Sequence, residues 1–184
     1  MKRAIITPAD VAGAALSELK DWLAITSGRD DAPLATLLSG ALDLFEAFTA
    51  QMPLEQTCEE VLPATGAWQK LKTRPVQAIT GLEGIPAEGA RFALAATDYE
   101  VDLDADGSAR VRVIRQGSAG RIAVRFTAGI APQWAALPPA IRDGVIRFAA
   151  HGYRQRDLDG NSAANIPPAA VAALWQPWRI LRLA

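Results

Sequence analysis

The acidic residues between positions 102 and 107 are the part of the sequence that most resembles a cation site. Asp102, Asp104, Asp106 and Gly107 have the alternating carboxylates and the turn glycine that open a calcium-binding loop. The bidentate acid expected near the end of such a loop falls at Val113 instead, and the flanking residues alternate as strands do rather than helices. The pattern therefore favours a hairpin turn at Asp106 and Gly107 over a calcium site.

The residues that could act as nucleophiles or bases are few. His151 is the only histidine and Cys58 the only cysteine, which excludes a multi-histidine metal site, an internal disulfide and a cysteine-based zinc site. Ser118 lies between glycines but lacks the spacing of a nucleophile elbow. A small hydrolase that uses His151 and a carboxylate is an alternative, but we expect a protein that is not an enzyme and needs no cofactor.

The overall charge and apolar patterning set limits on partners and location. The formal net charge of the 184 residues is -1, so no general attraction to nucleic acid or to an anionic membrane is expected. The apolar pair Ile5 and Ile6 is too short for a signal peptide, and no apolar run approaches the roughly 20 residues that cross a bilayer. We expect a cytosolic folding environment and no membrane partner.

Helical periodicity predicts helices in the N-terminal and the C-terminal parts of the sequence. Thr7 and Pro8 are typical of a helix start, and Leu16, Leu19 and Leu23 then recur at helical spacing, which predicts a helix from Pro8 to Ile25. A second helix should begin at Asp30 or Asp31, which can cap it, and end before Pro53, so that residues 1–52 form an antiparallel hairpin. A third long helix is expected over residues 138–157, with an exposed Asp143–Arg147 ion pair and with Arg142 and Arg154 on its outer side.

Between the helices, residues 54–130 have the alternation of short antiparallel strands, separated by Gly and Pro. Val111, Val113, Ile122, Val124 and Phe126 should form one side of the last two strands, which leaves a cationic face made by Arg110, Arg112, Arg121 and Arg125. Such a face could contact a neighbouring subunit or DNA phosphates, and a DNA-binding accessory protein is the main alternative function. The predicted class is α+β: a helical core with an inserted small antiparallel sheet and a C-terminal tail, in a single domain of residues 1–184.

The C-terminal segment, residues 166–184, concentrates large apolar and cationic side chains where termini are usually polar and frayed. Trp and Arg are enriched at binding hot spots. The segment can either pack back onto its own domain or dock on a partner through Trp175, Trp178, Arg179, Ile180 and Arg182.

The ordered series of these features resembles the head-to-tail connector, or adaptor, proteins of tailed phages and gene transfer agents, and the gene-transfer-agent branch in particular. The similar segments run through nearly the whole chain and are Thr7-Pro8, Glu18-Leu19-Lys20, Asp30-Asp31, Leu34, Leu37, Leu38, Glu46-Ala47-Phe48-Thr49, Gln56-Thr57, Arg74-Pro75-Val76, Asp98-Tyr99, Val101-Asp102, Val124 to Gly129, Leu137-Pro138, Ile141-Arg142 and Ala150 to Tyr153.

The resemblance implies a non-enzymatic subunit, made in the cytoplasm of a bacterial host, that forms a ring at the head-tail interface of a particle. The ring would have twelve copies, with a monomer in solution, and would join the portal protein to tail-side stopper or tail proteins. Double-stranded DNA would pass through the lumen without sequence-specific contact. The C-terminal residues named above would grip the portal, and Arg112, Arg125, Arg142, Arg147 and Arg154 would meet acidic surfaces of neighbouring subunits.

Overall fold

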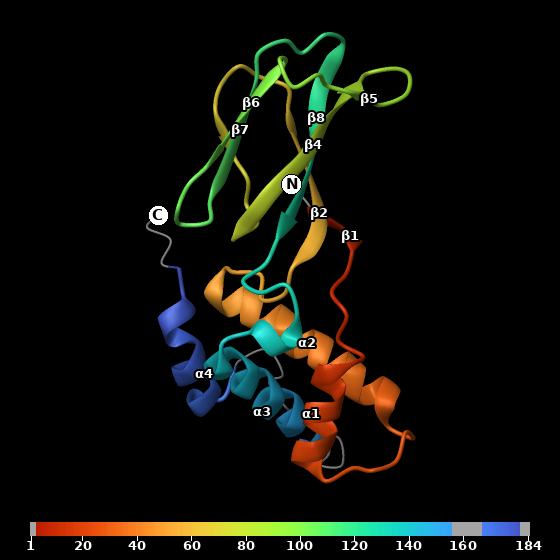
Figure 1. The fold of residues 1–184 in the computed structure, drawn as a ribbon, viewed down its shortest axis with the longest axis vertical. Coiled ribbons are helices and arrows are strands. Elements are labelled where there is room, and N and C mark those ends of the chain that lie inside the picture. Colours follow the sequence, from red (N-terminus) through yellow and green to blue (C-terminus); the bar gives the residue numbers. More distant parts are fainter. Residues whose placement is uncertain (1–2, 156–166, 181–184) are drawn as a thin grey trace. The chain divides into compact units, whose positions relative to one another are not determined.

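The computed structural model of the chain describes residues 3–155 and 167–180, and these residues form two compact units. A β unit consists of residues 1–8 and 55–129, and a helical unit consists of residues 9–54 and 130–184. The presence of helices and antiparallel sheets confirms the α+β class (Figure 1). Across the described parts of the chain, no helix has both the length and the apolar character needed to cross a membrane.

The β unit contains two antiparallel sheets (Figure 1). The five-stranded sheet has the order β1-β2-β8-β4-β5, and the three-stranded sheet has the order β3-β7-β6. The strand bounds are β1 Arg3–Thr7, β2 Gln56–Pro63, β3 Gln69–Lys70, β4 Val76–Pro86, β5 Phe92–Ala93, β6 Tyr99–Leu103, β7 Ala109–Val113 and β8 Ala119–Ala128.

The helical unit is built around one hydrophobic core. Its elements are α1 Ala14–Leu23, α2 Asp31–Thr49, the short 3-10 helix η1 Trp134–Ala136, α3 Pro139–Gln155, α4 Ala169–Trp175 and the 3-10 helix η2 Gln176–Trp178. The core brings together one face of each long helix and the inner side of α4, through residues such as Leu19, Leu38, Phe45, Ile141 and Trp175. Removal of these apolar side chains from water is the main stabilising contribution.

The predicted helix start at Thr7 and Pro8 is wrong. Thr7 is the last residue of β1 and pairs with Thr57 of β2, while α1 begins only at Ala14. The run Ile5, Ile6 and Thr7 is rich in β-branched residues, which favour a strand once a partner strand is available. That partner lies about fifty residues further along the chain, so the local Thr-Pro signal was misleading.

The second helix has the predicted position but not the predicted cap. α2 runs from Asp31 to Thr49, and the Asp30 side chain at its N-cap makes no cap hydrogen bond. Asp30 and Asp31 instead contact neighbouring helices. The Lys20 ammonium of α1 donates to Asp31 at 2.7 Å, and the Tyr153 hydroxyl of α3 donates to Asp30 at 3.2 Å. These acids therefore link α2 to α1 and α3.

The hairpin predicted at Asp106 and Gly107 is confirmed as the turn between β6 and β7. Gly107 has a φ of 75°, and its amide donates to the Asp104 carbonyl at 3.0 Å. A β-carbon at this position would lie 2.5 Å from Pro75, so both the backbone angle and the close approach require glycine. Hydrogen bonding by Ser108, whose amide donates to Asp106 at 2.8 Å, lowers the pKa of Asp106.

Candidate functional site

The first candidate site is the C-terminal segment, where Trp175 is the central residue. Its side chain is 0% exposed and meets Phe45 edge to face, with ring centroids 5.4 Å apart, while Phe48 lies at 6.3 Å. The expectation that Trp175 itself contacts a partner therefore does not agree with the structure. This residue follows the other alternative, packing back onto its own helices, and it anchors the segment that continues beyond it.

The residues after Trp175 lie against the C-terminal end of α2. The Gln51 side-chain amide donates to the Trp178 carbonyl, and the Ile180 amide donates to the Thr49 carbonyl at 3.0 Å. The Arg179 guanidinium lies 5.3 Å from the centre of the Phe48 ring and is exposed. Trp178, Arg179 and Ile180 thus form a supported surface that a partner could contact, whereas Arg182 lies outside the described residues.

Gly144 is the position of α3 against which the Trp175 ring packs. A β-carbon at Gly144 would lie 2.2 Å from the indole Nε1 and 2.8 Å from Cε2. We expect Gly144→Ala to lower the free energy of unfolding by about 1–3 kcal/mol through overpacking, although alanine is the better helix former. Gly40→Ala in α2 is the matched control. Nothing lies within 4 Å of that built β-carbon, so this change should raise the free energy of unfolding by about 0.5–1 kcal/mol.

Urea denaturation of the two glycine variants measures both changes. Opposite signs at Gly144 and Gly40 would support the packing of Trp175 on α3. The same sign at both positions would contradict it.

The second candidate site is the outer side of α3. The predicted pair of Arg147 with Asp143 is confirmed at 2.9 Å, and hydrogen bonding by Asp143 raises the pKa of Arg147. Arg147 also lies 5.7 Å from the ring centre of Trp22, an exposed tryptophan of α1 that the sequence analysis did not single out. Arg142 is 3.7 Å from Glu18, and Arg154 is exposed.

The third candidate site, a single cationic face on the last two strands, is wrong in two respects. β7 and β8 belong to different sheets, so Arg110 and Arg112 do not share a sheet face with Arg121 and Arg125. Most of these arginines are also paired within the chain, because Arg110 bonds to Asp102 and Arg112 contacts Glu100 at 2.6 Å. The spacing of the arginines was visible in the sequence, but the strand pairing that brings acids to them was not.

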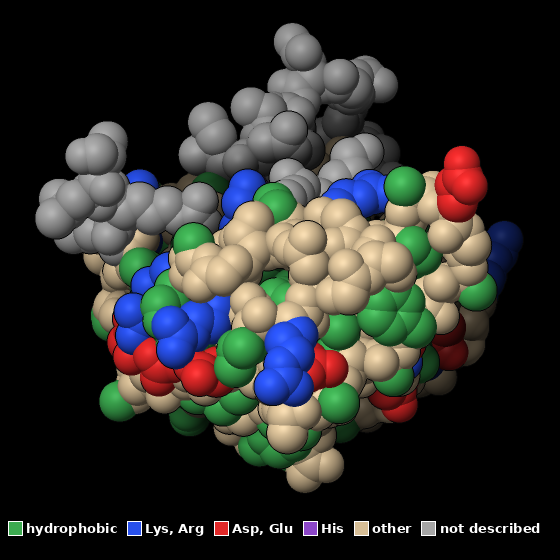
Figure 2. Space-filling model, turned by 90° about the horizontal axis from the view of Figure 1, so that it is seen from above, with side chains coloured by type: hydrophobic (Ala, Val, Ile, Leu, Met, Phe, Trp, Pro, Cys, Tyr) green, Lys and Arg blue, Asp and Glu red, His purple; other side chains and the backbone are tan. Residues whose placement is uncertain are grey.

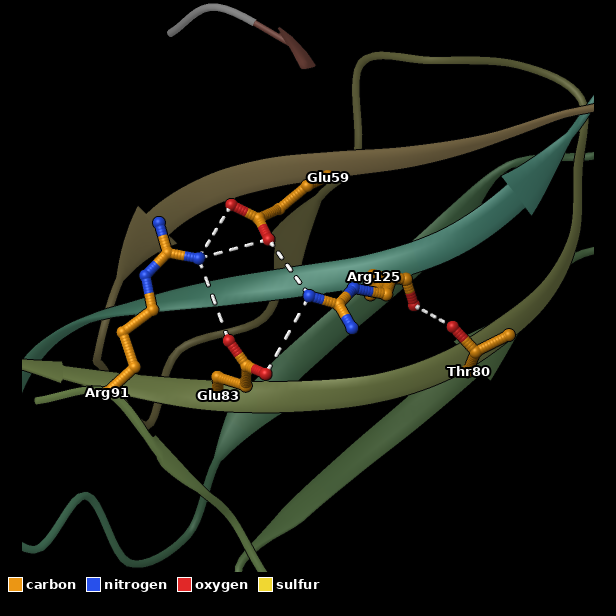
Figure 3. A network of polar contacts seen from close by, with 5 residues as sticks. All are labelled: Glu59, Thr80, Glu83, Arg91 and Arg125. Carbon is orange, nitrogen blue, oxygen red and sulfur yellow. Dashed lines mark hydrogen bonds and ion pairs between the residues drawn. The ribbon is translucent and has the colours of Figure 1, made fainter. Parts of the chain in front are cut away.

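Arg125 belongs to a network of two arginines and two glutamates on the five-stranded sheet (Figure 3). Glu59 of β2 accepts from Arg91 at 2.9 Å and lies 3.7 Å from Arg125, while Glu83 of β4 lies 3.6 Å from Arg91 and 3.7 Å from Arg125. The hydrogen bond that Arg91 donates to Glu59 raises the pKa of Arg91. The network is charge-balanced, so it is not a surface that would attract DNA phosphates.

Charge balance extends to other charged side chains of the surface. In Figure 2, the basic side chains at the left and at the centre of the face shown lie beside acidic ones. Trp68, another exposed tryptophan that the sequence analysis missed, lies below Arg110 and Arg112, with their guanidinium carbons 5.8 and 4.8 Å from its ring. These pairs disfavour the alternative of a DNA-binding protein that uses an arginine face.

The remaining chemical candidates do not assemble into a reactive site. His151 is exposed on α3, and Cys58 is fully buried in β2, where it acts as a small packed side chain. Within residues 3–155 and 167–180, no three His, Cys, Asp or Glu side chains are grouped so as to hold a metal ion. The carboxylates of the supposed calcium loop instead contact arginines: Asp102 and Asp104 contact Arg110, and Asp106 lies 3.5 Å from Arg74.

Comparison with known proteins gives matches among solved structures. Neither a protein-family model nor a curated protein matches the chain. A chain of "Neck of empty GTA particle computed with C6 symmetry" matches with a TM-score of 0.79. Chains of "Virion of native gene transfer agent (GTA) particle" and "Neck of native GTA particle computed with C12 symmetry" match with TM-scores of 0.76 and 0.75. Each is 27% identical, and each alignment covers 100% of this chain and 98% of the other.

Proposed function

We propose that the chain is a structural, non-enzymatic subunit of the neck of a gene-transfer-agent-like or tailed-phage particle, in which copies form a ring between the portal and the tail. The observation that carries this proposal is the likeness to neck chains over 100% of this chain and 98% of the other, at 27% identity. A likeness confined to one unit would support a shared fold alone, whereas this one includes both units.

The ring is proposed to contain twelve copies. The similar neck structures were computed with C6 and C12 symmetry, which favours a closed ring of this order. A head-to-tail ring needs two different, complementary patches on each subunit. The pairing of Arg110, Arg112 and Arg125 with acids of their own chain agrees with a lumen through which double-stranded DNA passes without sequence-specific contact.

The portal-docking surface is proposed to lie in the C-terminal segment, residues 166–184. Trp178, Arg179 and Ile180 would contact the portal, together with Arg182, while the buried Trp175 would hold this surface on the helical unit. Trp and Arg contribute most of the binding energy at many interfaces, which agrees with this assignment. Tail-side proteins would bind another surface of the ring.

Contacts between subunits are proposed to use the arginines of α3 and of the sheets, namely Arg112, Arg125, Arg142, Arg147 and Arg154. Four of these, all except Arg154, already contact an acid of their own chain. Charges of this kind chiefly set the register and the approach of two surfaces rather than their total affinity.

Co-purification from particle-producing cells tests the portal-docking surface. Combining Trp178→Ala with Arg179→Glu leaves Trp175 in place, and we expect it to reduce recovery of the portal at least tenfold, because two hot-spot side chains are lost. Particles from these cells should consist of heads without tails. Arg29→Glu, an exposed charge reversal before α2, is the control and should recover the portal like the wild type.

Two outcomes would contradict different parts of the proposal. Normal recovery of the portal and normal tails with the double variant would show that the docking surface lies elsewhere. Absence of the wild-type chain from purified particles would overturn the neck assignment itself.

A further inference from the structure

Exposed apolar side chains gather on two strands of the β unit. Ile5 and Ile6 of β1 are 45% and 49% exposed, and Val101 and Leu103 of β6 are 42% and 46% exposed. Large apolar side chains that gather in one place on a surface often mark an interface. β1 and β6 lie on different sides of the β unit (Figure 1), so they make two separate patches.

Both strands are the long edge of their sheet. β1 ends the five-stranded sheet and β6 ends the three-stranded sheet, and each is five residues long. The opposite edges, β5 and β3, are two residues long. A very short edge strand offers little for another chain to pair with, whereas a longer one presents a row of backbone donors and acceptors. β5 covers only Glu83 and Gly84 of β4, so part of that strand is also uncovered, but β1 and β6 are the outermost strands of five residues and are called the two open edges.

The two open edges lack two of the features that normally block pairing, although β1 has a bulge between Ile5 and Thr7. Neither β1 nor β6 contains proline or lysine, which proteins place on edge strands to prevent association. Among the described residues, β1 pairs only with β2 and β6 only with β7. Backbone hydrogen bonds and burial of the exposed apolar side chains are therefore both available to a strand that adds to either edge.

The charges on the two strands decide which edges would pair. Arg3 is the only charged residue of β1, whereas β6 carries Glu100 and Asp102. Like charges directly opposite each other destabilise a strand pair and opposite charges stabilise it. Two copies of β6 paired antiparallel about Val101 would oppose Glu100 to Asp102. Pairing of β1 with β6 avoids this arrangement of acids.

We infer that β1 of one subunit pairs edge to edge with β6 of the neighbouring copy of the same chain, which joins the β units around the ring. This inference rests on the proposed ring. A head-to-tail ring requires two different patches that complement each other, and the two open edges of the β unit meet that requirement.

Cysteine cross-linking within assembled particles tests this pairing. Ile5→Cys is combined with Val101→Cys in one variant and with Leu103→Cys in another. Side chains directly opposite in paired strands have β-carbons about 4.5–5.5 Å apart, close enough for a disulfide after a small shift. Particles of at least one double variant, mildly oxidised and run on a non-reducing gel, should give a ladder of covalent multimers of the chain.

Matched controls identify the source of any ladder. Each single-cysteine variant should remain monomeric on the gel, since the native Cys58 is fully buried. A double variant of Val101→Cys with Arg121→Cys, an exposed position of β8 that is paired on both sides, with β2 and with β4, should also give no ladder.

The outcomes separate this inference from the neck assignment. If the chain is present in tailed particles but neither double variant gives a ladder above its controls, the pairing of β1 with β6 is wrong and the proposed function stands. If the wild-type chain is missing from the particles, the proposed function fails first.

Discussion

Replacing Trp175 with alanine is expected to lower the free energy of unfolding by about 3–5 kcal/mol, the usual loss for a large aromatic side chain removed from a core. Trp175 is fully buried and packs on Phe45, Phe48 and Gly144, so truncation leaves a cavity that α3 and α4 cannot readily fill. Urea denaturation measures the change. If the proposed docking segment is correct, the same variant should also lose the portal in co-purification, because that segment loses its anchor.

Two other substitutions give free energies of unfolding with which the Trp175→Ala value can be compared. Trp175→Phe should cost only about 1–2 kcal/mol, since it keeps an aromatic ring and removes a buried indole N–H that has no hydrogen-bond partner among the described residues. Trp22→Ala removes an exposed tryptophan and should cost about 1 kcal/mol or less. If Trp175→Ala were no more destabilising than Trp22→Ala, the buried position of Trp175 would be wrong.

The second large effect is expected at Glu60, a carboxylate of β2 that is only 2% exposed. One of its oxygens accepts from the Thr73 amide at 2.9 Å and from the Thr73 hydroxyl at 2.6 Å, and the other accepts from the Lys72 amide at 3.1 Å. Glu60→Ala leaves these donors without an acceptor. We expect a loss of about 3 kcal/mol in the free energy of unfolding, because unsatisfied buried groups are costly.

Glu60→Gln keeps the shape of the side chain but removes its negative charge. The amide keeps one acceptor oxygen but places an NH2 group against a backbone donor, so its loss should be smaller than that of Glu60→Ala. Glu88→Ala, in the exposed connection between β4 and β5, is the control and should change stability by less than about 0.5 kcal/mol. Equal values for Glu60→Ala and Glu88→Ala would contradict the hydrogen bonds to residues 72 and 73.

Elements with strong local signals could be predicted from the sequence. The acids Asp30 and Asp31 and the helix-breaking Pro53 located α2, and the Asp-Gly turn located the hairpin of β6 and β7. β1 was missed because its pairing depends on β2, a partner distant in sequence. Hydrophobic periodicity reports which face a segment buries, but not which other segment covers it.

The residues of the candidate sites could likewise be predicted only in part from the sequence. Composition identified the C-terminal tryptophans and arginines, but only the packing shows that Trp175 is buried while Arg179 is exposed. The arginines of β7 and β8 suggested a cationic face, whereas Glu59, Glu83 and Glu100 balance them across strands. The charge of a sheet surface depends on such cross-strand neighbours, and the order of residues in the sequence does not show which strands are neighbours.

The β unit is assembled from two separate stretches of chain, because its first strand precedes the helices and the others follow α2. This interleaving constrains how related particles can exchange parts by recombination. A transferred gene fragment that encodes residues 55–129 would bring β2 from one lineage to meet β1 from another. Because residues 3–7 pair with β2, the exchanged fragment must remain compatible with them.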